Sequence, residues 1–231
     1  MDFVTAKDFF ATLASDERVY LLVRHGERNH ITPNDPDFGA HVGLTERGRE
    51  QALSLGKAIP ADGDIVFFSS PVGRCMETAR YIGRGRAGVG SAVQVADSPH
   101  VEPLDCLAEY FVQNYDAYLD VLRAGFYEGI CAWLENEISQ RARGIREAFY
   151  PLASRSEEML SMMLEKGCAR FNIFATHDAW VVPCLTHFCK MRFTPQRWMN
   201  YLTGMAVVTD AQKRVFRIVP VTGLETGWLE F

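Results

Sequence analysis

The sequence predicts an α/β protein built on a mostly parallel central sheet. Residues 19–23, 64–69 and 171–176 form short apolar runs, the pattern of strands buried on both faces of a parallel sheet. Segments with apolar residues at helical spacing separate these runs. Arginine and histidine follow the first run directly, and histidine and aspartate follow the third. Because ligands bind at the carboxyl ends of strands in open α/β sheets, we expect a functional site at that edge.

Length and composition limit the class of protein. A chain of 231 residues suits one domain, and 48% hydrophobic with 23% charged residues is ordinary for a soluble globular protein. The net charge of -5 argues against a general nucleic-acid binder, because such binding depends on basic residues that neutralise phosphates. No apolar run approaches membrane-spanning length. We therefore expect neither a nucleic acid nor a membrane as partner.

The cysteines and the N-terminus indicate the compartment. None of the six cysteines forms a C-x-x-C pair, so no zinc or thioredoxin-type motif is present. Asp2 and Asp8 interrupt the apolar residues at the N-terminus, which is unlike a signal peptide. We expect a cytoplasmic protein with reduced cysteines.

The elements before the second strand are predicted from caps and spacing. Thr5 is a suitable N-cap for a helix over residues 5–15, which precedes the first strand. A loop over residues 29–43 leaves that strand and is expected to wall the site. Thr45 is the expected N-cap of the next helix, and Gly48 permits a close approach of that helix to the sheet.

A further helix is predicted directly after the second strand. Ser70 is its expected N-cap and Pro71 its first residue. Arg74 then lies in the first turn, off the predicted buried face, where a cation is better explained if an anion binds; an ordinary surface arginine is the alternative. Residues 83–88 match the dinucleotide pattern G-x-G-x-x-G but follow a helix, so we predict a flexible connection to a short strand over residues 92–96.

The second half of the chain predicts a helical segment and a return to the sheet. Strand patterns stop over residues 99–167, which we expect to form helices that cap the site, the last beginning at Ser156. Pro183 predicts that the helix after the third strand begins near it. Residues 205–209 and 214–219 predict an antiparallel hairpin at a sheet edge.

The polar residues at the strand ends are suited to phosphate chemistry. Guanidinium groups bind phosphate through two parallel hydrogen bonds, and a neutral imidazole can attack phosphorus. The leaving oxygen needs a proton, for which Asp178 and Glu109 are both candidates. The chain has no H-E-x-x-H motif, and arginines would repel a metal ion, so we expect neither a metal nor a cofactor. The residues expected to converge are Arg24, His25, Arg28, Arg74, His177 and Asp178.

The same residues resemble the motifs of the histidine phosphatase superfamily, which includes phosphoglycerate mutases, acid phosphatases and phytases. The resemblance implies a three-layer α/β/α sandwich, here a single domain over residues 1–231 with 99–167 as a helical insertion over the active site. The landmarks that carry it are, in order, Arg24-His25-Gly26, Leu44-Thr45-x-x-Gly48, Ser69-Ser70-Pro71 with Arg74 and Glu77-Thr78-Ala79, and Thr176-His177.

By this resemblance, His25 is the nucleophile that becomes phosphohistidine, and Arg24, Arg74 and His177 hold the phosphoryl group. The implied activity is hydrolysis of a small phosphorylated substrate. A mutase-type phosphotransferase and a non-catalytic phospholigand-binding module are the alternatives.

Two branches of the superfamily contribute features. Arg28 and the pair His177-Asp178 resemble the acid phosphatase and phytase branch, in which the aspartate donates the proton and the additional arginine joins the phosphate site. Glu109 and the compact length resemble the mutase-type branch, in which a glutamate is the donor. We expect Asp178 as donor first and Glu109 second.

Overall fold

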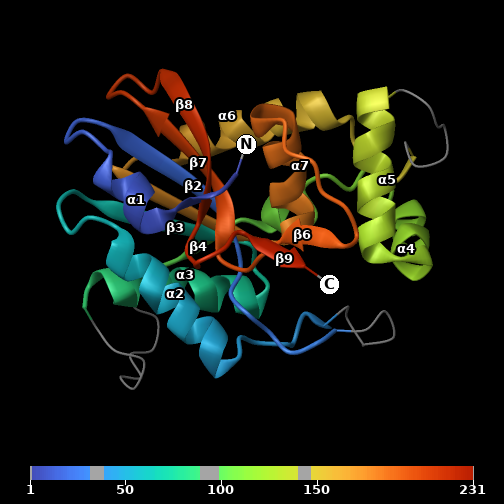
Figure 1. Cartoon of the computed structure of the whole chain (residues 1–231), viewed down its shortest axis with the longest axis horizontal. Helices are drawn as coiled ribbons and strands as arrows, with labels where there is room; N and C mark the ends of the chain where they lie inside the picture. Colours follow the sequence, from blue (N-terminus) through green and yellow to red (C-terminus); the bar gives the residue numbers. More distant parts are fainter. Residues whose placement is uncertain (1, 32–38, 89–98, 140–146, 231) are drawn as a thin grey trace.

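A computed structural model gives the architecture (Figure 1). A seven-stranded sheet has the strand order β1-β8-β7-β2-β5-β3-β4. Its parallel part consists of β2 (Arg18–Arg24), β5 (Phe171–Thr176), β3 (Ile65–Ser69) and the short β4 (Glu102–Pro103). The three predicted apolar runs are therefore the centre of the sheet. The structure describes residues 2–31, 39–88, 99–139 and 147–230.

The remaining strands complete the sheet on the other side of β2. The predicted hairpin exists as β7 (Thr203–Thr209) and β8 (Val215–Thr222), which pair antiparallel. Its expected place at the edge is wrong, because β7 also pairs with β2 and β1 (Val4–Thr5) pairs beyond β8. A separate two-stranded sheet joins β6 (Arg197–Met199) and β9 (Trp228–Glu230), which the sequence pattern did not reveal.

Helices cover both faces of the sheet, which confirms the three-layer sandwich (Figure 1). The helices α1 (Ala6–Ala11), α2 (Glu46–Ala58) and α3 (Gly73–Arg86) lie on one face, and α6 (Leu152–Lys166) and α7 (Asp178–Cys189) on the other. Alternate residues of β2 explain how one strand serves two cores. Its Leu21 and Val23 belong to the first core, while Tyr20 and Leu22 belong to the second.

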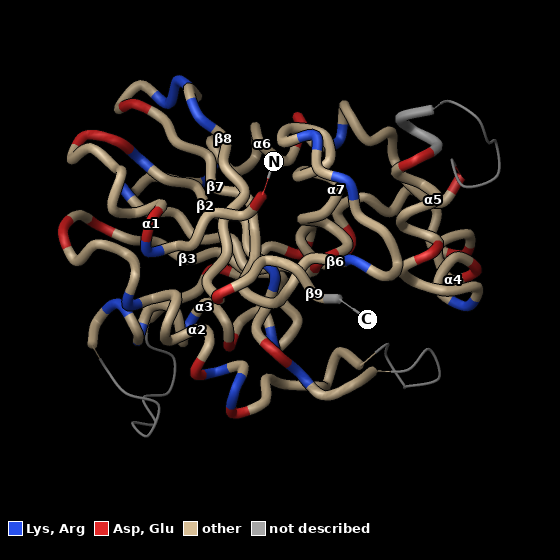
Figure 2. Tube along the Cα trace, in the orientation of Figure 1, with Lys and Arg blue, Asp and Glu red and all other residues tan. Residues whose placement is uncertain are grey.

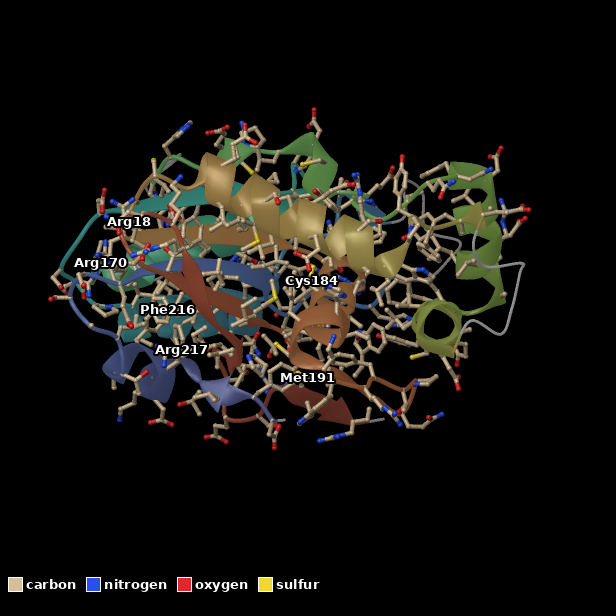
Figure 3. The ribbon with its side chains drawn as sticks, turned by 90° about the horizontal axis from the view of Figure 1, so that it is seen from above. Arg18, Arg170, Cys184, Met191, Phe216 and Arg217 are labelled. Carbon is tan, nitrogen blue, oxygen red and sulfur yellow. The ribbon has the colours of Figure 1, made fainter. Side chains whose placement is uncertain are left out.

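The stretch 99–167 contains two kinds of helix. The helices α4 (Tyr115–Ala124) and α5 (Phe126–Ser139) lie beyond α7, away from the sheet (Figure 1). The helix α6 instead runs over the sheet (Figure 3) and contributes Met159 and Met163 to the core of that face. The expectation that strands are absent from this stretch is wrong, because β4 pairs with β3. The role of residues 99–167 as a cap stays a prediction.

Two helix starts occur as predicted. The hydroxyl of Thr5 accepts a hydrogen bond from the amide of Asp8 at 3.2 Å, and α1 begins at the next residue, although it ends earlier than expected. The hydroxyl of Thr45 accepts one from the amide of Gly48 at 3.0 Å. A Cβ on Gly48 would lie 2.1 Å from the carbonyl oxygen of Glu27, so this glycine does allow a close approach next to the end of β2.

Three helix starts differ from the prediction. The helix α3 begins at Gly73 with Val72 as its N-cap residue, and the hydroxyl of Ser70 faces His177 at 3.2 Å. The helix α6 begins at Leu152, and Ser156 is fully buried inside it. The helix α7 contains Pro183 in its interior; nearly all of this helix is buried, and that packing outweighs the loss of one backbone hydrogen bond.

The glycine-rich stretch 83–88 is mostly helical rather than a flexible connection. The helix α3 continues through Gly83 and Gly85 to Arg86. A Cβ on Gly85 would lie 2.1 Å from the carbonyl oxygen of Leu53 in α2, so the glycine allows the two helices to touch. The strand predicted over residues 92–96 lies outside the described residues.

Candidate active site

The ends of β2 and β5 bring two histidines together. These strands pair in parallel with Arg24 opposite Thr176, so the residues that follow them are neighbours. The rings of His25 and His177 have centroids 5.6 Å apart. Arg74 joins them from the first turn of α3: its Nε lies 3.3 Å from His25 Nε2, and its Nη2 lies 3.4 Å from His177 Nδ1. Contrary to the prediction, Arg74 is buried.

Hydrogen bonds fix the protonation of the His25 ring. Its Nδ1 lies 2.8 Å from the carbonyl oxygen of Gly26, which can only accept, so Nδ1 carries the proton. The Nε2 atom therefore presents its lone pair on the side of Arg74. The amide of Gly26 donates to the hydroxyl of Thr78 at 3.0 Å, which holds this peptide in place.

The His177 ring is fixed in the opposite sense. Arg74 can only donate, so Nδ1 of His177 accepts from it. The Nε2 atom then donates to the hydroxyl of Ser70 at a distance of 3.2 Å. Sequence reasoning missed this role for Ser70, since a serine before a proline at a helix start is the usual signal of a cap.

Burial and neighbouring cations keep both imidazoles neutral. Burial first, and then electrostatic coupling to the His177 ring and the charges of Arg74 and Arg24, hold the pKa of His25 well below its ordinary value of 6.5. Burial and Arg74 lower the pKa of His177 to about 3. At neutral pH, the Nε2 atom of His25 therefore carries no proton, which is the state in which an imidazole can attack an electrophilic phosphorus.

Arg24 and Asp178 form a buried ion pair beside the histidines. The Nη2 atom of Arg24 lies 3.0 Å from Oδ2 of Asp178, and its Nη1 donates to the carbonyl oxygen of Met199 at 2.5 Å. The ring of Tyr201 lies 4.2 Å from the Arg24 guanidinium carbon. Burial alone would raise the pKa of Asp178, but Arg24 and a hydrogen bond from Trp198 outweigh it and lower the pKa below 3.8. Asp178 is therefore ionised in the free protein.

Arg28 adds a third cation near the same groups. Its Nη1 donates to the carbonyl oxygen of Asn29 at 2.9 Å, and its buried Nε has no hydrogen-bond partner among the described residues. Its charge contributes to lowering the pKa of Arg74, of His177 and of Asp178. Elsewhere both signs of charge are spread over the trace (Figure 2), so the positive charge of the site is local.

Glu109 does not join this cluster. It is exposed, and within the described ranges its carboxylate makes no hydrogen bond or ion pair. The short helix η2 (Asp105–Leu107) before it is fastened to the site, because the hydroxyl of Thr176 donates to the Leu107 carbonyl at 2.7 Å. Burial first, and then the carboxylates of Glu109 and Asp178, raise the pKa of Tyr118, so both acids act on this tyrosine.

Six of the seven predicted residues thus converge, and the fold and the site together define a protein of the phosphoglycerate mutase-like class. A family model for the histidine phosphatase superfamily (branch 1) matches residues 20–219. The chain belongs to this superfamily.

Solved structures share the fold at low sequence identity. YhfR from Bacillus stearothermophilus is 18% identical, with 87% of this chain and 96% of that chain covered and a TM-score of 0.51. A phosphoserine phosphatase from Entamoeba histolytica is 13% identical, with 88% and 96% covered and a TM-score of 0.50. A phosphoglycerate mutase from Bacillus anthracis is 14% identical, with 90% and 94% covered and a TM-score of 0.50. No curated protein matches the chain.

Two general properties complete the description. All six cysteines are free. Among the described residues, no helix combines the length and the apolar character that crossing a bilayer requires.

Proposed function

We propose that the protein is a phosphatase that hydrolyses small phosphomonoesters through a phosphohistidine intermediate on His25. One observation carries the proposal: the unprotonated Nε2 of His25 lies 3.3 Å from Nε of Arg74, and Nη2 of the same guanidinium lies 3.4 Å from Nδ1 of His177. An anion bound by Arg74 would therefore lie against the nucleophile.

In the first step, the lone pair of His25 Nε2 forms a bond to phosphorus and the bond from phosphorus to the ester oxygen breaks. The phosphoryl oxygens carry the charge through this step, and guanidinium groups stabilise it. Arg74 faces the nucleophile, and Arg24 and Arg28 each have a buried Nε without a hydrogen-bond partner among the described residues. The groups proposed to hold the phosphoryl group are Arg24, Arg28, Arg74 and His177.

The leaving oxygen takes a proton from a carboxyl group, for which Asp178 is our first candidate. Asp178 is ionised in the free protein because cations surround it. A bound phosphate ester neutralises those cations and adds negative charge, which raises the pKa of Asp178 and favours uptake of a proton. Glu109 is the second candidate; it follows a segment fastened to β5 and to α7, since Trp180 donates to the carbonyl of Ala108 at 2.7 Å.

In the second step, water attacks phosphorus, the bond to His25 Nε2 breaks, and the carboxylate takes the proton of the water. This releases inorganic phosphate and restores the neutral imidazole.

The six free cysteines support the further proposal that the protein works in the cytoplasm, where thiols stay reduced.

The test is phosphate release from an aryl phosphate by His25→Ala, with His100→Ala as the matched control because His100 is exposed. We expect His25→Ala to lose at least about 1,000-fold in kcat/KM, since it lacks the nucleophile, and the control to match the parent protein. Full activity of His25→Ala would contradict the proposal. Transfer of the phosphoryl group to a phosphoglycerate instead of water would indicate a mutase, and tight binding without turnover a binding module.

A further inference from the structure

We propose that Trp198 is a positioning residue of the active site, whose indole N–H holds the Asp178 carboxylate against Arg24 and directs the transferable proton to Oδ1 of Asp178. The inference rests on the proposed function in one respect, the use of Asp178 as proton donor. The geometry that supports it stands independently of that activity.

The two oxygens of Asp178 have different partners. Its Oδ2 accepts from Nε1 of Trp198 at 2.9 Å and faces Nη2 of Arg24 at 3.0 Å. Its Oδ1 accepts only the amide of Ala179, at 3.1 Å, among the contacts of the described residues. Because two donors already occupy Oδ2, a proton taken up by this carboxyl group is accepted at Oδ1.

Other aromatic side chains enclose Trp198 and hold its indole in place. The residue is fully buried, and the rings of Tyr127, Phe193 and Phe126 surround its indole with centroids 5.1, 5.9 and 6.2 Å away. A buried indole N–H needs an acceptor, and the only one it has among the described contacts is Asp178.

The residue after Trp198 fixes the other half of the ion pair. The Met199 carbonyl accepts from Arg24, and the Tyr201 ring lies against the same guanidinium. The strand β6 thus contacts both members of the Arg24–Asp178 pair. Pairing of Trp198 with Leu229 in β9 anchors this strand at the backbone.

Several charged and titratable groups face Asp178, and Trp198 is the only neutral donor among its side-chain partners in the described part of the chain. Loss of a hydrogen bond to an ionised carboxylate raises its pKa. The charged and titratable groups that act on Asp178 are Arg24 in β2, Arg28 in the loop after it, Arg74 and Cys75 in α3, His177 before α7, Tyr118 in α4 and Tyr127 in α5.

The first test uses pH profiles of kcat for an aryl phosphate in Trp198→Phe and in the matched control Trp228→Phe. Phenylalanine keeps the ring but removes the N–H, and Trp228 donates the same kind of hydrogen bond to Asp2 at 2.7 Å instead of to Asp178. We expect the high-pH limb of kcat to move up by about one pH unit in Trp198→Phe only. A uniform loss of kcat with no movement of the limb would overturn the proposal.

The second test does not depend on enzyme activity, and it does not require that Trp198→Phe folds. In ¹H–¹⁵N spectra of the whole protein, Asp178→Asn should shift the indole signal of Trp198 and leave that of Trp228 unchanged. An unmoved Trp198 signal would refute the positioning role. If the parent protein has no phosphatase activity, the proposed function fails, and this spectrum still decides whether Trp198 holds Asp178.

Discussion

At the scale of single residues, the site consists of two neutral histidines that share one arginine. The Gly26 carbonyl can only accept, so it fixes the tautomer of His25. The Arg74 guanidinium can only donate, so it fixes the tautomer of His177. This arrangement leaves Nε2 of His25 unprotonated, where it accepts a hydrogen bond from Arg74, and turns Nε2 of His177 toward Ser70. The protonation pattern is therefore a property of the resting fold.

The neutral state of His177 makes stability depend on pH. Its pKa of about 3 lies below the ordinary 6.5, so the unfolded chain binds one proton more between these values, and stability falls as the pH falls through that window. We expect His177→Gln to reduce the slope of unfolding free energy between pH 6 and 4 by about 1.4 kcal/mol per pH unit. Urea denaturation measures it, and exposed His100→Gln is the control. An unchanged slope in His177→Gln would contradict a neutral ring at His177.

Replacement of Arg24 by lysine should reduce activity although it keeps the positive charge. Its planar group contacts Asp178, the Met199 carbonyl and the Tyr201 ring at once, which a single ammonium cannot reproduce. We expect Arg24→Lys to lower kcat/KM for an aryl phosphate on the order of 100-fold. Arg214→Lys, at an exposed pair with Asp210, should leave it unchanged. A kcat/KM of Arg24→Lys within about twofold of the parent value would show that the planar guanidinium group is not needed.

The sequence predicts some of these residues and not others, for a physical reason. Arg24, His25 and His177 each follow a buried apolar run, so their position at a strand end can be inferred from hydrophobicity alone. Trp198 and Ser70 act through tertiary contacts with residues 20 and 107 positions away. No local pattern records such contacts.

At the scale of elements, close approaches between helices matter as much as caps. The backbones of α2 and α3 touch at Gly85, where the side chain of any other residue would collide with the Leu53 carbonyl. The apolar runs predicted the central strands almost to the residue, because burial on both faces leaves a strong signal. Helix starts were less predictable, since packing placed Ser156 and Pro183 inside helices rather than at their beginnings.

The contact at Gly85 leads to a stability prediction. Gly85→Ala places a methyl group 2.1 Å from a backbone oxygen, so the helices must separate, and we expect a loss of about 1–3 kcal/mol in unfolding free energy. Gly73→Ala is the matched control in the same helix, because nothing lies within 4 Å of its Cβ position. Chemical denaturation compares the two variants. Equal stability of both would mean that α2 and α3 are not in contact at this point.

At the scale of the whole molecule, the sandwich explains why distant segments form one site. Parallel β2 and β5 end side by side, and β3 delivers α3 to the same edge. The substrate could not be predicted, because the segments that we expect to select it, residues 29–43 and 99–167, carry no motif.

The most direct measurement is the trapping of a phosphoenzyme. The protein is mixed with an aryl phosphate, quenched in base within milliseconds to preserve the acid-labile phosphorus–nitrogen bond, digested and mapped by mass spectrometry. The account predicts phosphate on His25 alone and none in His25→Ala. Phosphate on any other residue, or turnover with no phosphoenzyme at all, would contradict it.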